Sequence, residues 1–495
     1  HERFAGQSAQ ALRNTPVDPQ DALTRWAIDY LASNTDHNLP AMLDAALERS
    51  YSANPQESFF TGGGVHTFGN FRREDNNRIA TVKESLRESL NLPFVRIMRD
   101  IVRYTIHHEP GSSAKLLGDD SDPRRQAYLQ RFADREGQVF LQRFWRKYQG
   151  KNTQERLEAF LDGLRQNPVR LSAVHRYLYP DADEASFGQF LRARLPNEQL
   201  TERRIRELYK RYGPGAFNLP DQAYVARVHP LELWLLSYLH RHPEARLRDA
   251  VEASAQQRQE VYGWLFRTRA KNARDSRIRT MLEVEAFLDI HRRWQRLGYP
   301  FGHLVPSLAT ALGSSGDRPA ALAELMGIIL NDGVRLPAVR IDHLHFAKDT
   351  PYEVELGRTP VQGEQVMHPD VAAALKGALA DVVEGGTARR LQGTFKTDDG
   401  TVLTLGGKTG TGDNRIETVG AGGQRIRSRA LNRTATFVFY LGDDHFGTLT
   451  AFVPGREAAN FRFTSALPVQ VLKGMAPLLQ PYLTAGGETG CRSQP

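Results

Sequence analysis

Residues 109–300 have a strongly helical pattern of apolar and polar positions. Leucine, phenylalanine, tyrosine and tryptophan recur at helical spacing among dense arginine, glutamate and glutamine, most clearly in 122–148 and 202–212. Strand-like alternation is scarce in this part of the chain. The pattern therefore predicts a helical insertion within a chain of otherwise mixed texture.

The C-terminal part of the chain has a strand pattern instead. Runs of β-branched and aromatic residues, bounded by glycine and aspartate, predict strands over 401–405, 434–441 and 447–453. The polar, glycine-rich stretch 412–432 predicts a long hairpin excursion, and the apolar spacing of 466–482 predicts a final helix.

These textures predict four parts. Residues 1–108 and 301–483 both mix helices with short strands, so we expect them to form one α+β domain that is interrupted by the helical insertion, 109–300. The last residues, 484–495, are rich in glycine and polar residues and are expected to be a disordered tail.

Charge and cysteine content narrow the classes of function. The formal net charge of +8 suits a solvated basic surface or an anionic partner. The single cysteine, Cys491, excludes an internal disulfide framework and a cysteine-based zinc site. No apolar run approaches the roughly 20 residues needed to span a bilayer. Because the chain begins at His1, we expect a processed chain or a fragment, with any export signal or anchor outside it.

The strongest candidate for chemistry is the glycine-rich stretch 406–412, which reads Gly-Gly-Lys-Thr-Gly-Thr-Gly. A phosphate-binding P-loop would need a glycine where Val402 stands and a helix directly after the motif, and neither is present in the pattern. A Lys-Thr-Gly element beside a strand is instead typical of penicillin-binding proteins and serine β-lactamases.

The residue types of this element suit acyl transfer to an extended peptide. The ammonium of Lys408 favours the deprotonated form of a neighbouring nucleophile. Thr409 and Thr411 offer hydroxyls to a substrate carboxylate, and Gly410 lets a substrate backbone approach closely.

A second candidate element is Ser89-Leu90-Asn91. Apolar residues at four-residue spacing before it and Pro93 after it predict a joint between two helices. At such a joint the Ser89 hydroxyl can relay a proton and the Asn91 amide can bind a substrate carbonyl. Helix capping is the simpler alternative for an isolated Ser-x-Asn, so the element gains weight only when it is paired with Lys408.

Taken together, these segments resemble the class A penicillin-binding proteins, which are bifunctional peptidoglycan synthases. The stretch 82–96 resembles that family's Ser-x-Asn segment, 304–333 its segment between the catalytic motifs, and 382–390 the segment before its Lys-Thr-Gly strand. The resemblance covers 1–105 and 300–483, with the motifs in the family's order. It implies a transpeptidase fold like that of serine β-lactamases, in which helices flank an antiparallel sheet.

The resemblance also implies function and partners. It assigns Ser89 and Asn91 to the second catalytic motif and Lys408, Thr409 and Gly410 to the third. The implied activity is D,D-transpeptidation of peptidoglycan stem peptides on glycan strands through a serine acyl-enzyme, with β-lactams as inhibitors, at the periplasmic face of the bacterial inner membrane. No cofactor and no nucleic acid are expected, and the helical insertion is a candidate contact for another cell-wall protein.

One motif of the family is out of place. Its nucleophile belongs to a Ser-x-x-Lys that precedes the Ser-x-Asn motif, yet no serine before Ser89 has a lysine three positions later. The chain's Ser-x-x-Lys, Ser112 to Lys115, follows Ser89 instead and is the alternative nucleophile pair. We expect the true nucleophile, and the family's glycosyltransferase domain, to lie upstream of residue 1, so that this chain alone forms no acyl-enzyme.

Three alternatives stay open or are set aside. A D,D-carboxypeptidase or β-lactamase-like hydrolase would use the same motifs, and a non-catalytic cell-wall-binding module would use the fold alone. The pairs His107-His108 and His343-x-His345 raise the question of a metal, but neither has the helical four-residue spacing at which two histidines converge on one ion, so no metal is expected.

Overall fold

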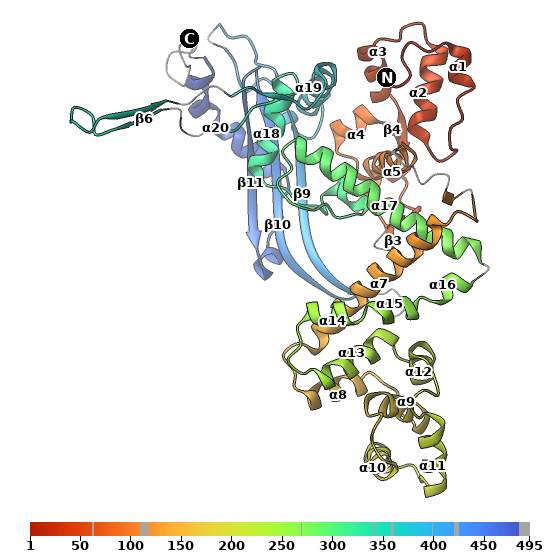
Figure 1. Cartoon of the computed structure of the whole chain (residues 1–495). Helices are drawn as coiled ribbons and strands as arrows, with labels where there is room; N and C mark the ends of the chain where they lie inside the picture. The colour runs from red at the N-terminus through yellow and green to blue at the C-terminus, as the bar shows by residue number, and fades with distance from the viewer. Residues whose placement is uncertain are drawn as a thin grey trace. The chain divides into compact units, whose positions relative to one another are not determined.

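The structure is a computed structural model that describes residues 1–61, 64–108, 116–117, 119–268, 270–339, 341, 343–357, 361–397, 399–419 and 425–484. The chain separates into two compact units (Figure 1). Unit 1 comprises His1–Ser112 and Glu283–Pro495, and unit 2 comprises Ser113–Leu282. The proposed nucleophile pair Ser112 and Lys115 lies outside the described residues.

The centre of unit 1 is a three-stranded antiparallel sheet with the strand order β11-β10-β9 (Figure 1). Strand alternation sends Val438 and Tyr440 of β10 toward α18 and α19, whereas Phe437 and Phe439 pack in the same core as α20. Helices therefore cover both faces of an antiparallel sheet, and the predicted α+β fold class is confirmed. The elements are α18 (Pro319–Leu330), α19 (Pro369–Glu384), β9 (Leu405–Val419), β10 (Arg425–Leu441), β11 (His445–Pro454) and α20 (Ala466–Thr484).

The strands are longer than the sequence pattern predicted. We predicted strands over 401–405 and 434–441 joined by a long hairpin excursion over 412–432. The hairpin is confirmed, because β9 and β10 pair antiparallel as far as Val419↔Arg425 with two register irregularities, but β9 begins only at Leu405. Among the described residues of 396–404, the β pairing is limited to the isolated bridge between Lys396 and Val402. Residues 408–411 consequently lie inside a strand and not at its end.

The N-terminal part of unit 1 combines short strand pairs with helices. Helix α2 packs with α1 and α3 around a small core that contains Leu12, Ile28 and Leu31. Helix α5 packs through Leu92 and Val95 against the C-terminal half of α17. The elements are α1 (Ala9–Arg13), α2 (Ala22–Ser33), α3 (Leu39–Leu47), β1 (Ser50–Ser52), β2 (Ser58–Thr61), β3 (Gly64–Thr67), β4 (Ile79–Thr81), α4 (Val82–Glu88), α5 (Asn91–His108) and α17 (Lys271–Arg296).

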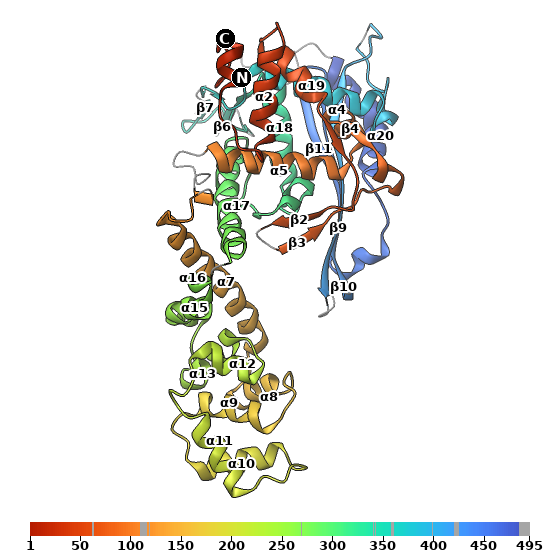
Figure 2. The ribbon, with the colours of Figure 1, turned by 90° about the vertical axis from the view of Figure 1, so that its right-hand side faces the viewer.

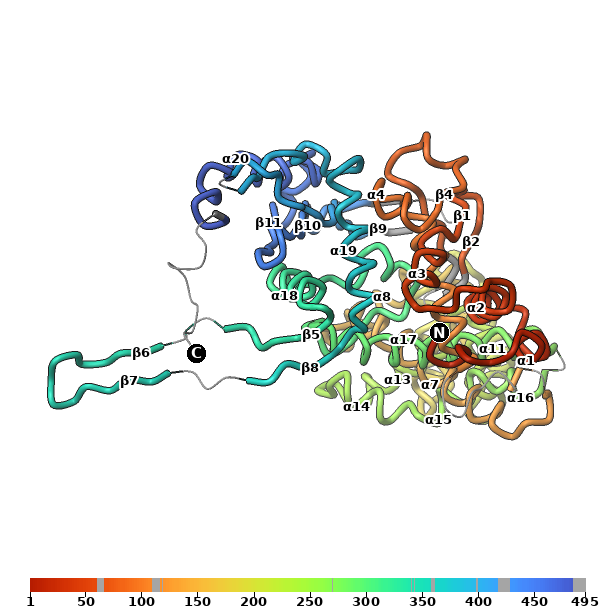
Figure 3. The backbone as a smooth tube through the Cα atoms, turned by 90° about the horizontal axis from the view of Figure 1, so that it is seen from above, coloured from red at the N-terminus to blue at the C-terminus, as the bar shows by residue number. Residues whose placement is uncertain are grey.

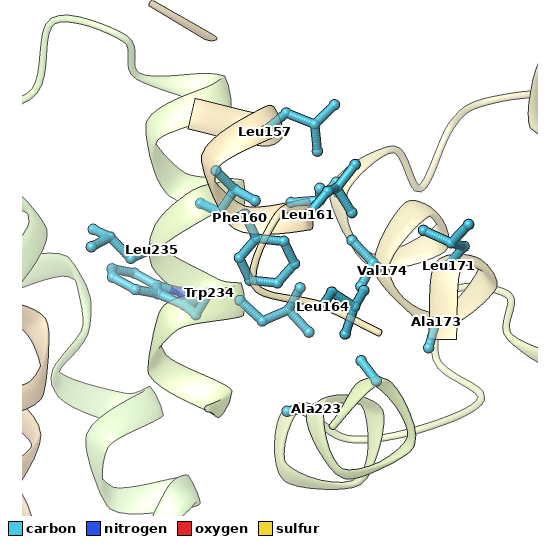
Figure 4. Packing of buried hydrophobic residues seen from close by; sticks show 14 of the residues in the cluster. Leu157, Phe160, Leu161, Leu164, Leu171, Ala173, Val174, Ala223, Trp234 and Leu235 are labelled. Atoms are coloured by element: carbon cyan, nitrogen blue, oxygen red, sulfur yellow. The ribbon is translucent and has the colours of Figure 1, made fainter. Parts of the chain in front are cut away.

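Unit 2 is helical throughout its described residues. Its core gathers leucine and aromatic side chains from successive helices, with Phe160, Leu161 and Val174 meeting near Trp234 (Figure 4). The helices are α7 (Arg124–Tyr148), α8 (Thr153–Leu161), α9 (Pro168–Leu178), α10 (Glu184–Arg194), α11 (Glu202–Arg211), α12 (Leu219–Ala226), α13 (Pro230–Arg241), α14 (Leu247–Ala253), α15 (Ala255–Val261), α16 (Trp264–Arg267) and the first part of α17.

A β-ribbon leaves unit 1 between α18 and α19. Its base is the pair β5 (Val334–Arg335) and β8 (Glu364–Gln365), and its outer part is the antiparallel pair β6 (His343–Phe346) and β7 (Val354–Gly357). Figure 3 shows β6 and β7 extending away from β5 and β8. Every residue of β6 and β7 is exposed.

Among the described residues, no helix combines the length and the apolar character that crossing a bilayer requires.

Candidate functional site

Lys408 and Ser89 touch, although 319 residues separate them along the chain. The Nζ of Lys408 donates a hydrogen bond of 2.7 Å to Ser89 Oγ and another of 3.0 Å to the carbonyl oxygen of Thr409. Both groups belong to unit 1. The contact joins the Ser-x-Asn and Lys-Thr-Gly elements at one place in the molecule.

The environment of Lys408 makes its amine easier to deprotonate. Burial lowers the pKa of Lys408 from 10.5 to about 8, since a charged ammonium is disfavoured away from water. Roughly a quarter of the amines with such a pKa are neutral at pH 7.5. Lys408 can therefore both donate a proton to and accept one from the hydroxyl that it contacts.

Ser89 is presented by the end of a short, well-capped helix. Helix α4 begins at a capping box formed by Thr81 and Glu84, and it ends at Ser89 in a left-handed conformation with φ 60° and ψ 47°. The N–H groups of Ser89 and Leu90 both donate to the carbonyl of Ser85, which closes the helix. Glycine is the usual residue in this conformation, because a side chain is strained there. The strained backbone conformation at Ser89 indicates that the serine hydroxyl has a functional role at this position.

Helix α4 is fixed against the segment that follows α19 (Figure 2). The N–H of Thr387 donates to the carbonyl of Arg87 over 3.2 Å, and a Cβ added at Gly386 would lie only 2.3 Å from that carbonyl oxygen. Lys83 of α4 and Asp381 of α19 form an ion pair of 3.2 Å. This close approach places the end of α4 at the sheet.

Thr387 also connects this segment to β9. Its Oγ1 lies 2.7 Å from Oγ1 of Thr409, the residue after Lys408. The sequence analysis did not single out Thr387 or Gly386 as part of the site. The sequence feature that could have identified these two residues is Gly-Gly-Thr at 385–387, since adjacent glycines often mark a close backbone approach.

The predicted substrate-binding residues divide between the two faces of β9. Alternation along the strand puts Lys408 and Gly410 on one face and Thr409 and Thr411 on the other. Thr409 is buried against Thr387, and the hydroxyl of Thr411 accepts a hydrogen bond of 2.9 Å from the N–H of Ser465. The two threonine hydroxyls thus already have protein partners, whereas we had expected both to serve a substrate carboxylate.

The glycines of the 406–412 stretch differ in their roles. A Cβ at Gly406 would lie 2.4 Å from the Tyr440 ring, and one at Gly407 would lie 2.3 Å from the Val438 carbonyl oxygen, so packing against β10 requires both glycines. A Cβ at Gly410 would meet no atom within 4 Å. Gly410 is exposed, and its missing side chain leaves space beside Lys408 that the fold does not use.

Strand β9 lies at the edge of the described sheet, beyond β10. One row of its backbone groups pairs with β10, and the other row faces away from the sheet. An extended peptide can bind to such an edge as an additional strand. The edge carries Lys408 and the open position at Gly410, so a peptide paired there would pass the lysine amine and the Ser89 hydroxyl.

Asn91 lies at the predicted joint between two helices, and its side chain binds a neighbouring loop. It is the first residue of α5, and its Nδ2 donates to the carbonyl oxygen of Gly69 over 2.9 Å. In the part of the chain that the structure describes, no hydrogen bond joins Asn91 to Ser89 or Lys408. The structure therefore brings together Lys408 and Ser89, and it gives Asn91 a role in holding the start of α5.

No family model and no curated protein matches the chain. Structural neighbours are transpeptidase domains of penicillin-binding proteins. They include the D,D-transpeptidase domain of a peptidoglycan glycosyltransferase from Eggerthella lenta, at 13% identity over 41% of this chain and 51% of that chain, with a TM-score of 0.26. Penicillin-binding protein A from M. tuberculosis, in a ceftriaxone acyl-enzyme complex, is 16% identical over 40% and 46%, with a TM-score of 0.26.

Penicillin-binding protein 2B from Streptococcus pneumoniae is 17% identical over 43% of this chain and 35% of that chain, with a TM-score of 0.27. This chain spans about half or less of the length of each of these neighbours. Identities and scores of this size assign no function, so the functional proposal depends on the residues of the site.

Proposed function

We propose that this chain is the D,D-transpeptidase module of a class A penicillin-binding protein, which cross-links peptidoglycan stem peptides through a serine acyl-enzyme. The contact between Lys408 and Ser89 at the edge strand is the observation that carries this proposal. Two residues so distant in sequence, and both singled out by one family's motifs, have no structural need to meet. The proposed location is the periplasmic face of the inner membrane.

The proposed chemistry assigns proton transfer to the pair. A serine oxygen attacks the penultimate D-alanine carbonyl of a stem peptide bound along β9, the C–N bond breaks, and D-alanine leaves as its amine. Ser89 passes a proton to that amine, and Lys408 replaces it from the proton released by the attacking serine. A neighbouring stem peptide's amine then displaces the acyl group, with the protons moving in the reverse direction.

Each residue of the pair suits this role for a physical reason. The pKa of Lys408, lowered to about 8, lets the amine give and take protons near neutral pH. The Ser89 hydroxyl is both a donor and an acceptor, so it can bridge the amine and a substrate group. The free side of β9 supports an extended peptide, and Gly410 leaves room for that peptide's backbone.

The proposed nucleophile is the serine of a Ser-x-x-Lys that precedes this sequence, because no such pair precedes Ser89 within it. The glycosyltransferase domain of the class is proposed to lie there as well. Ser112 of Ser112-x-x-Lys115 is the rival nucleophile.

Labelling with a fluorescent penicillin tests the function. We expect the protein extended by its upstream sequence to be labelled, and Lys408→Ala to lose labelling by at least about a hundredfold. Lys473→Ala removes an exposed lysine of α20 in the same unit and is the matched control. Undiminished labelling of Lys408→Ala, in protein whose circular dichroism is unchanged, would refute the assignment of Lys408.

Two further arms of this experiment separate the alternatives. Labelling of the 495-residue chain that disappears in Ser112→Ala would identify Ser112 as the nucleophile. Products formed from a stem peptide with and without an acceptor amine distinguish cross-linking from hydrolysis. Gly410→Val is expected to keep stability and to weaken peptide turnover, because its side chain would occupy the space beside Lys408.

A further inference from the structure

The outer β-ribbon brings four potential metal ligands close together. Strands β6 and β7 pair antiparallel, with His345 opposite Glu355 and His343 opposite Gly357. Directly paired residues share a face, and alternate residues along a strand do too. His343, His345 and Glu355 therefore line the same side of the ribbon, and Glu353, the residue before β7, contacts His345. The two-residue spacing of the histidines lacks the helical pattern of converging ligands, so the sequence alone did not predict this grouping.

The ligand atoms are already within the span of one ion. Single ligand atoms of His345, Glu353 and Glu355 all lie within 4.8 Å of one another. His345 contacts both carboxylates, with Nε2 2.5 Å from Glu353 Oε1 and Nδ1 3.7 Å from Glu355 Oε1; one ion takes only one of these nitrogens, so the 4.8 Å span is the relevant distance. Zinc bonds to imidazole nitrogen and carboxylate oxygen are about 2.0–2.2 Å long, so two ligands of one ion are separated by roughly 3–4 Å. Small side-chain rotations bring these atoms to that spacing.

His343 contacts this group through Glu355 and is the neighbouring candidate for a fourth ligand. Its Nε2 is 3.8 Å from Glu355 Oε2, on the side of Glu355 toward the base of the ribbon. Two histidines and two carboxylates complete a tetrahedral set without any other residue.

The charge and anchoring of the cluster also suit a divalent cation. Two carboxylates with neutral imidazoles carry a charge of −2, and among the described residues these carboxylates form ion pairs only with the two histidines. The N–H of Asp349 donates to Glu353 Oε2 over 3.1 Å, which fixes that carboxylate and leaves Oε1 toward His345. In contrast, His108 of the His107-His108 pair is bound to Asp21 over 2.7 Å at the end of α5.

We propose that the ribbon binds one Zn²⁺ ion through His345, Glu353 and Glu355, with His343 as the fourth ligand. Imidazole with carboxylate selects zinc and similar first-row divalent ions over Mg²⁺ and Ca²⁺, which prefer all-oxygen sites. The ion cross-links β6 to β7. A two-stranded ribbon without a covering layer is marginally stable in water, and every residue of these strands is exposed. Zinc would therefore order the ribbon.

Calorimetric titration of the chelator-treated 495-residue chain with ZnCl2 tests the site. We expect His345→Gln and Glu355→Gln each to weaken the tightest zinc site by at least about tenfold. His303→Gln removes an exposed histidine elsewhere in unit 1 and is the matched control. Co²⁺ in place of Zn²⁺ should give the visible absorption of a tetrahedral site, which the two ligand variants lose. Unchanged affinity and stoichiometry in both ligand variants would overturn the proposal.

Hydrogen exchange supplies a second readout that does not depend on other zinc-binding histidines. Zinc should slow the exchange of amides in 343–357 in the natural chain and not in His345→Gln. Because β6 and β7 contribute to no described core, these variants should keep the circular dichroism of the natural protein. Zinc binding that leaves exchange in 343–357 unaffected in the natural chain would place the ion elsewhere and refute the assignment.

Discussion

Replacing Lys408 by methionine should reveal how much the buried amine costs the fold. The substitution keeps an unbranched side chain of similar length and removes the charge. The pKa of Lys408 is about 8 in the folded protein and 10.5 when unperturbed, so between these values the unfolded chain binds more protons than the folded one. The contribution of Lys408 to the free energy of unfolding therefore increases as the pH rises from 8 to 10.5.

The magnitude follows from the two pKa values. Because the pKa of Lys408 falls from 10.5 in the unfolded chain to about 8 in the folded protein, this group destabilises the folded protein by about 3 kcal/mol at pH 7. At pH 10 the destabilisation is just under about 1 kcal/mol. The free energy of unfolding of the natural protein, relative to Lys408→Met, should thus increase by about 2.5 kcal/mol between pH 7 and pH 10. The variant has no amine at this position, so the comparison cancels the titration of all other groups.

Denaturant-dependent hydrogen exchange of the β9 and β10 amides, followed by mass spectrometry, measures the free energy of unfolding of unit 1 separately from that of unit 2. Lys83→Met, which removes a half-exposed lysine of the same unit, controls for the loss of one amine. A difference between the natural protein and Lys408→Met that stays constant from pH 7 to pH 10 would show that burial does not shift this amine. The proposed proton transfer would then lose its physical basis.

Two further predictions concern how Ser89 is placed. Ser89→Gly should unfold at a higher free energy than Ser89→Ala by about 1 kcal/mol in guanidinium titrations, since glycine adopts φ 60° without strain; equal stabilities would show that the left-handed turn is not strained. Gly386→Ala should destabilise unit 1 by about 2–3 kcal/mol, because the new Cβ would lie 2.3 Å from the carbonyl oxygen of Arg87. At Gly385 the nearest atom would be 4.0 Å away, so Gly385→Ala should cost clearly less, and equal losses would contradict the close approach.

The sequence predicted which residues meet but not how the chain brings them together. Lys408 and Ser89 could be assigned to one site because the Lys-Thr-Gly and Ser-x-Asn motifs occur together in one family. A glycine-rich loop or a helix cap taken alone would not have predicted their contact. The left-handed turn at Ser89 could not be predicted, since serine carries no local preference for it. The hydrogen bond of Asn91 could not be predicted for a related reason: its acceptor, the Gly69 carbonyl, lies 22 residues away and depends on tertiary packing.

The long strands show the same limit. The glycine-rich, polar sequence after Lys408 indicated a hairpin but not the bounds of its strands, because pairing with β10 continues β9 as far as Val419. The helices of unit 2 were easier, because their apolar spacing specifies a buried face directly, as in α7 and α11. The grouping of Glu353 and Glu355 with His345 could not be predicted from local sequence, since Glu355 meets His345 through the strand register and Glu353 meets it across the turn that joins β6 to β7.

The order of the two units along the chain has a consequence for biosynthesis. Unit 2 is encoded entirely between the segments that supply Ser89 and Lys408, so the ribosome finishes it before β9 exists. At roughly 5–20 residues per second, the 319 residues between the pair take on the order of 15–60 s to make. When unit 2 has just been made, α4 has no α19 to pack against and α5 lacks the half of α17 that it packs against, so both helices present apolar side chains to the surroundings. We therefore expect nascent chains halted after unit 2 to engage chaperones through their N-terminal hundred residues, and to release them once β10 and α20 have emerged.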